Sequence, residues 1–157
     1  MKRFLSVALT LVLSLTLSAC STVGRTDPTE TNDNETSRDP STETLVVIGE
    51  STRFSQDEIS EAIDRVEEKI DEFKYCENVC LKYDEAECAR WVDDYMMYGH
   101  GTFNGVSQEN VIIILSEFTT PNDVGETAFN PNGTYNWRFI LIRDNPDSPW
   151  RVDDWGY

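Results

Sequence analysis

The chain has 157 residues, of which 39% are hydrophobic, and this length and composition suit a single domain. Its 29 Asp and Glu residues outnumber its 13 Lys and Arg residues and give a net charge of -16. Such a charge repels phosphate backbones, so nucleic acid is not an expected partner. The simplest interpretation is a solvated acidic surface, and the alternative is an electrostatic docking patch.

The first 19 residues have the organisation of a signal peptide. Lys2 and Arg3 supply positive charge, and residues 4–17 form an apolar segment that is too short and too rich in Ser and Thr to span a membrane. We therefore predict that residues 1–19 are a signal peptide that is removed during export.

The signal segment ends in Leu17-Ser18-Ala19-Cys20, which resembles the lipobox of bacterial lipoproteins. The resemblance implies that Cys20 is the lipidation site and becomes the mature N-terminus. A diacylglyceryl cysteine carries two chains, as stable anchoring requires, so the expected location is the extracytoplasmic face of the cell membrane. The alternative is an ordinary secretory signal followed by an unmodified cysteine.

Residues 20–44 are predicted to form the lipidated cysteine and an acidic, Thr-rich tether. The segment has Val23 as its one sizeable apolar residue, so it cannot bury enough surface to order itself. As a coil it would hold the domain on the order of 30 Å from the membrane. Glycosylation or partner binding by this segment is an alternative that its composition leaves open.

The folded domain is predicted to span residues 45–157. It begins with an apolar run at 45–48, either an edge strand or a segment packed on the core. A helix is expected from Ser55, because Ser55 and Glu58 have the spacing of a capping box. Its apolar residues recur at helical spacing, which favours a core helix over a partner-binding one: Ile59, Ala62, Ile63, Val66, Ile70 and Phe73.

The middle of the domain is predicted to contain a strand, a helix and a second strand. Residues 75–83 have a strand pattern, and Asp84 with Glu87 can cap a helix that stops at Gly99. Residues 111–115 are a continuous run of apolar residues, mostly β-branched. Such a run is expected of a central strand covered on both faces.

The C-terminal residues 134–157 are predicted to form a hairpin around the turn at 144–148. Large side chains share one parity of its first strand: Tyr135, Trp137, Phe139 and Leu141. They require a cover, because a hairpin alone is marginal in water. The order of elements indicates an α+β fold, with the long N-terminal helix and a shorter second helix packed as one layer on a curved antiparallel sheet.

Residues 54–157 resemble the domain numbered 4829 among the domains of unknown function, in the NTF2-like, cystatin-like group. The resemblance lies in the opening Phe54-Ser55, Phe73, Cys76, Tyr83-Asp84-Glu85, Glu109-Asn110, Leu115-Ser116, Asn130-Pro131-Asn132, Thr134-Tyr135, Trp137, Trp150-Arg151-Val152 and Asp154-Trp155-Gly156-Tyr157. It implies an NTF2-like fold and brings no established activity, cofactor or catalytic residue.

The cysteines after Cys20 have two interpretations. Cys80 and Cys88 flank a strand-to-helix reversal, so a disulfide between them is predicted, and three buried thiols with Cys76 are the alternative. The spacing of these cysteines and His100 does not fit common zinc sites, so no metal is expected.

No familiar catalytic motif occurs in the sequence, and His100 lies between glycines, which favours a solvated histidine. Asp154 is in phase with Trp150 and Val152, which would point it into the concave sheet face. Tyr135, Trp137 and Asp154 are therefore the candidate pocket. The alternative is that Asp154 bonds to backbone beside a strand end and the aromatic residues are core.

These observations leave two classes of function, and neither requires a cofactor. The leading one is a non-catalytic binding or accessory domain at the cell surface, with an unknown protein or small-molecule ligand. The other is a small-molecule isomerase or lyase with an Asp and Tyr pocket on the concave sheet face.

Overall fold

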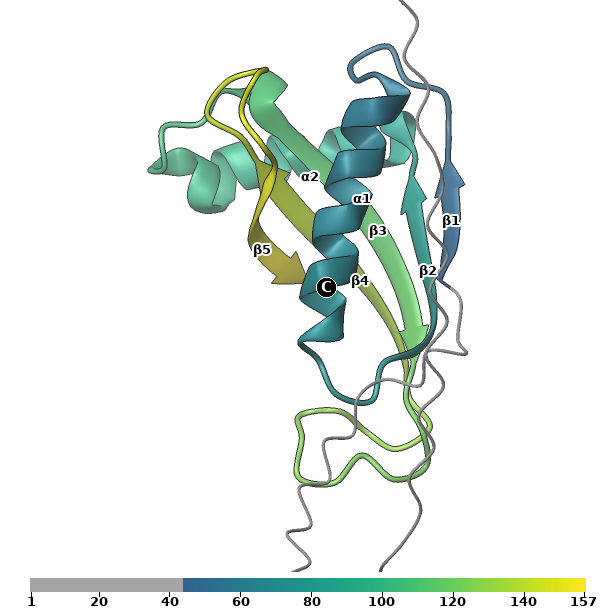
Figure 1. Ribbon diagram of the computed structural model, residues 1–157. Helices are drawn as coiled ribbons and strands as arrows, with labels where there is room; N and C mark the ends of the chain where they lie inside the picture. The colour runs from purple at the N-terminus through teal and green to yellow at the C-terminus, as the bar shows by residue number, and fades with distance from the viewer. Residues whose placement is uncertain (1–43) are drawn as a thin grey trace, which may run out of the picture. The chain divides into compact units, whose positions relative to one another are not determined.

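The computed structural model describes residues 44–157, and in it five strands form one sheet in the order β1-β2-β3-β4-β5 (Figure 1). The predicted signal peptide, Cys20 and all of the tether except Thr44 lie outside the described residues. The elements in chain order are β1 (Leu45–Ile48), α1 (Gln56–Asp71), β2 (Glu77–Tyr83), α2 (Glu85–Tyr98), η1 (His100–Thr102), η2 (Gln108–Asn110), β3 (Val111–Thr119), β4 (Thr134–Ile142) and β5 (Arg151–Gly156).

The sheet is mixed, whereas an antiparallel sheet was predicted. The difference lies at one edge, at strand β1. The pairs β2·β3, β3·β4 and β4·β5 are antiparallel, whereas β1 pairs with β2 in parallel. The crossover through α1 explains the parallel pair, because it returns the chain to the end of the sheet from which β1 started. The predicted α+β class, with two helices and a sheet, is confirmed.

Helix α1 covers one face of the sheet. Its start is the predicted capping box: Ser55 Oγ accepts from the Glu58 N–H at 3.2 Å, and the Ser55 N–H donates to Glu58 Oε2 at 2.8 Å. The helix ends at Asp71, so Phe73 lies beyond its last turn. Its buried stripe packs on alternate residues of the central strands, which include Ile112, Ile114, Phe139 and Leu141.

Helix α2 covers the opposite face, so the predicted single helical layer is wrong. Its N-cap is Asp84, as predicted, and its buried residues Cys88, Val92 and Tyr95 pack on Val111, Ile113 and Ile142. Figure 1 shows α1 and α2 on the two sides of the sheet. Strand β3 requires this arrangement, because its residues of both parities are apolar and need cover.

The predicted C-terminal hairpin is present, with an irregularity in its second strand. Val152 pairs with Leu141 and Asp154 with Ile140, so Asp153 is an extra residue of β5. A β-bulge of this kind changes which side chains point to each face. As a result Asp154 lies on the α2 side of the sheet, whereas Val152 lies on the α1 side.

None of the helices within residues 44–157 is both long enough and apolar enough to cross a membrane.

Candidate functional site

The α1 face of β4, where the candidate pocket was predicted, is filled by aromatic rings. We call Phe118, Phe129, Tyr135 and Trp137 the α1-face cluster. Phe118 stacks on Tyr135 with centroids 5.2 Å apart, and its ring meets Trp137 edge-on at 5.1 Å. The Tyr135 hydroxyl accepts the Asn130 N–H at 2.7 Å, which fixes the following turn. Tyr135 is therefore part of the core, as the alternative interpretation held, and Trp137 is a half-buried residue that packs against this core.

Asp154 does not join Tyr135 and Trp137, and this corrects its predicted direction. The bulge at Asp153 places Asp154 opposite Ile140, on the face that α2 covers. Its Oδ1 accepts the Trp155 N–H at 2.9 Å, which is the backbone bond beside a strand end that was considered as the alternative. The structure thus separates the predicted acid from the predicted tyrosine by the thickness of the sheet.

Cys80 and Cys88 are free thiols, which corrects the predicted disulfide between them. The Cys88 thiol instead donates to the carbonyl of Ile113 at 3.3 Å, in the core under α2. Burial raises the pKa of the Cys88 thiol to about 11, which keeps it protonated and a poor nucleophile at neutral pH. Within residues 44–157 no group of His, Cys, Asp and Glu is arranged to hold a metal ion.

A hydrogen-bonded cluster that the sequence did not reveal lies at the end of α2. The Tyr95 hydroxyl donates to Asp153 Oδ2 at 2.6 Å, and Asn104 Nδ2 donates to the Tyr95 oxygen at 2.6 Å. His100 Nδ1 lies 3.0 Å from the same Asp153 oxygen, so His100 is paired, although its side chain is 47% exposed. Burial and the Asp153 carboxylate raise the pKa of Tyr95, so Tyr95 remains a proton-bearing donor.

Beside this cluster lies an open cleft between α2 and strands β4 and β5, which we call the α2 groove. It consists of two cavities of about 320 and 280 Å3 that share Trp91, Arg138 and Tyr157 in their walls. The first is also lined by Glu87, Arg90, Leu115, Ser116, Asn136 and Trp137. The second is also lined by Asp94, Tyr95, Ile140, Asp154, Trp155 and Gly156.

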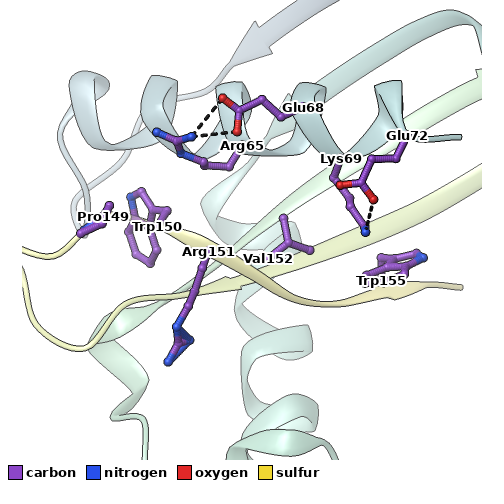
Figure 2. A pocket seen from close by; sticks show the side chains of 9 residues that line it. All are labelled: Arg65, Glu68, Lys69, Glu72, Pro149, Trp150, Arg151, Val152 and Trp155. Carbon is purple, nitrogen blue, oxygen red and sulfur yellow. Dashed lines mark hydrogen bonds and ion pairs between the residues drawn. The ribbon is translucent and has the colours of Figure 1, made fainter.

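A second cleft, of about 530 Å3, lies between α1 and β5 (Figure 2). Its charged wall belongs to α1 and is internally neutralised, because Arg65 pairs with Glu68 at 2.7 Å and Lys69 pairs with Glu72. The Lys69 ammonium also lies 4.4 Å from the ring centroid of Trp155. The cations of this cleft are therefore engaged, which distinguishes it from the α2 groove.

Comparison with known proteins identifies the family of the chain. A search of curated proteins and a search of solved structures gave no match. A family model described as "Domain of unknown function (DUF4829)" matches residues 50–156, which include every helix and strand after β1. This match confirms the resemblance to that domain. The chain therefore belongs to the DUF4829 family.

Proposed function

We propose that this protein is a lipid-anchored lipoprotein on the extracytoplasmic face of the cell membrane, and that its DUF4829 domain is a non-catalytic binding or accessory domain. The observation that carries the proposal is which face of the sheet has an open cleft. The α1-face cluster fills the site where a catalytic pocket was expected, whereas the α2 groove is open and lined by aromatic and charged side chains. Such a groove suits recognition of a ligand.

The separation of Asp154 from Tyr135 favours binding over the alternative isomerase or lyase. General-base chemistry requires a carboxylate against apolar walls with a facing proton donor. Asp154 is half-buried on the α2 side, and the Tyr135 hydroxyl is occupied by the Asn130 N–H on the α1 side. In the cluster at the end of α2, Asp153 Oδ2 already accepts a hydrogen bond from the Tyr95 hydroxyl and lies 3.0 Å from His100 Nδ1, so this oxygen is occupied as well.

The proposal of a lipid anchor is supported by the lipobox-like residues that end in Cys20. Lipidation there would supply the two acyl chains that stable attachment requires. We also propose that the domain belongs to the NTF2-like, cystatin-like group. A helix packed across strands β2 to β5 supports this relationship, and the position of α2 on the opposite face departs from the one-sided layer predicted for it.

Photocrosslinking in intact cells tests the binding role. A photoreactive amino acid replaces exposed Asn136 in the α2 groove, and a matched control replaces exposed Asp64 on α1. We expect a discrete adduct, identified by mass spectrometry, from position 136 and none from position 64. Identical adducts at both positions, or none at position 136, would contradict a binding role for this groove.

A further inference from the structure

Two arginines of the α2 groove differ from the other arginines that the structure describes. Each of the others donates to a carboxylate or to a backbone carbonyl: Arg53, Arg65, Arg143 and Arg151. Within residues 44–157, Arg90 and Arg138 have no hydrogen bond to protein and no carboxylate at ion-pair distance. In a chain with a net charge of -16, two cations without an acidic partner are an unexpected pair.

Both guanidinium groups are held by the same side chain, Trp91. The Cζ atoms of Arg90 and Arg138 lie 4.1 and 3.6 Å from the centroid of the Trp91 ring. These distances place the two Cζ atoms closer together than the screening length of about 8 Å at physiological ionic strength. The like charges therefore repel each other, and Trp91 keeps them adjacent through cation–π contact.

The cavity of about 320 Å3 that both arginines line has the composition of a site for an organic anion. Its acidic wall residue, Glu87, is already paired with Lys82 at 2.8 Å, which leaves the two arginines as the uncompensated charges. Asn136 adds an exposed amide, and Leu115 adds an apolar surface. Guanidinium groups bind carboxylate and phosphate oxygens in two-pronged geometry, which an ammonium cannot reproduce.

The electrostatic surroundings of Arg138 favour the binding of a negative charge beside it. Desolvation and the charge of Arg90 lower the pKa of Arg138, while Asp94 acts in the opposite direction from the adjoining cavity. Asp154 also lines that adjoining cavity. An anion in the cavity that both arginines line would relieve the repulsion between them, and neither Asp94 nor Asp154 lines that cavity.

We infer that the cavity lined by Arg90, Trp91 and Arg138 binds a small organic anion, whose carboxylate or phosphate group is held by the two guanidinium groups at the edge of the Trp91 ring and whose apolar body rests on Leu115. The inference names the ligand class of the α2 groove and rests on the binding function proposed above. It also gives the exposed Arg90 and the half-buried Arg138 one shared role.

Calorimetry on the full chain in a non-ionic detergent tests this site. The probes are benzoate, phenyl phosphate and the neutral benzamide, which share an aromatic body and differ in the head group. We expect both anions to bind and benzamide to bind at least about tenfold more weakly. The stronger of the two anions identifies the head group. Anions that bind no better than benzamide would overturn the inference.

Charge variants locate the binding. Arg138→Gln should weaken anion binding at least about tenfold, and Arg90→Gln, at an exposed position, does the same without a risk to folding. Asp94→Asn should strengthen binding, because it removes a repulsive charge. The control Arg65→Gln changes the net charge equally but lies in the other cleft, so it should leave binding unchanged.

Equal losses in Arg65→Gln and Arg90→Gln would show a non-specific charge effect and overturn the site. The photocrosslinking result distinguishes failure of the anion-binding inference from failure of the proposed binding function. A specific adduct from position 136 without anion binding would remove the ligand class and keep the binding role. Absence of both the adduct and anion binding would overturn the ligand class and the binding role together.

Discussion

The Tyr95 hydroxyl donates a hydrogen bond of 2.6 Å to Asp153 Oδ2, and this bond ties the last turns of α2 to the bulge of β5. Asp153 is the extra residue of that bulge, so the irregularity that turns Asp154 to the α2 side also supplies the acceptor for Tyr95. The relationship joins residues 58 positions apart in the sequence. It fixes the helix against the sheet beside the α2 groove, which Tyr95 lines.

Tyr95→Phe should lower the free energy of unfolding by about 1.5–3 kcal/mol, because it removes a partly buried hydrogen bond to a carboxylate. It also leaves the Asn104 amide without its acceptor. Chemical denaturation measures the loss. The control is Tyr98→Phe, on a side chain that is 78% exposed, and equal stability of the two variants would show that the bond to Asp153 contributes nothing.

Glu85→Gln should lower stability at neutral pH and have little effect in acid. Hydrogen bonds from Thr52 and Ser51 hold the pKa of Glu85 at about 2, below its ordinary value of 4.5. A lowered pKa means that the carboxylate stabilises the folded state above pH 4.5, and that this contribution is lost as the pH falls toward 2.

Denaturation midpoints of wild type and Glu85→Gln should therefore converge between pH 4.5 and 2. Glu126→Gln, at an exposed loop position, is the matched control for removal of one acidic charge. A difference between wild type and Glu85→Gln that persists unchanged at pH 2 would refute the assigned role of the carboxylate.

Trp137→Ala should cost about 3 kcal/mol of unfolding free energy, because its ring packs edge-on against Phe73 and Phe118 on the α1 side of the sheet. Trp155→Ala is the comparison, since that ring is 41% exposed and should cost less. Trp137→Phe should cost less than Trp137→Ala, because the indole N–H that it removes is buried without a partner. A loss below about 1 kcal/mol for Trp137→Ala would place the ring outside the core.

Local sequence patterns predicted the elements of the fold well, because their causes are local. The capping box of Ser55 and Glu58, the N-cap Asp84 and the alternation along β4 each depend on residues a few positions apart, and each is found in the structure. The side on which α2 lies was predicted wrongly. The apolar residues of both parities in β3 contained that information, since each face of the strand needs a cover.

The candidate site was predicted poorly because it depends on register and on distant contacts. One extra residue, Asp153, reverses the parity of Asp154, and no turn signal in the sequence marks the bulge. Arg90 and Arg138 meet only because α2 lies against β4, and the sequence separates them by more than a third of the folded domain. A pair of arginines around a tryptophan has no spacing rule from which it could be found.

Cys20→Ala should abolish palmitate labelling and release the protein from the membrane, because the lipidated cysteine is the proposed anchor. Metabolic labelling and cell fractionation measure both effects. Cys80→Ala is the control, since it removes a cysteine of the folded domain without touching the lipobox. Unchanged labelling of Cys20→Ala would disprove the lipoprotein assignment.

The most direct test of the account is to observe the indole N–H signals of the four tryptophans by NMR during a titration with phenyl phosphate. Trp91 and Trp137 line the cavity that holds the proposed anion, Trp155 lines the adjoining cavity, and Trp150 lines only the cleft beside α1. We predict that the Trp91 signal shifts to saturation with the largest change of the four, while the Trp150 signal remains in place. A shift at Trp150 with a stationary Trp91 would contradict ligand binding in the α2 groove.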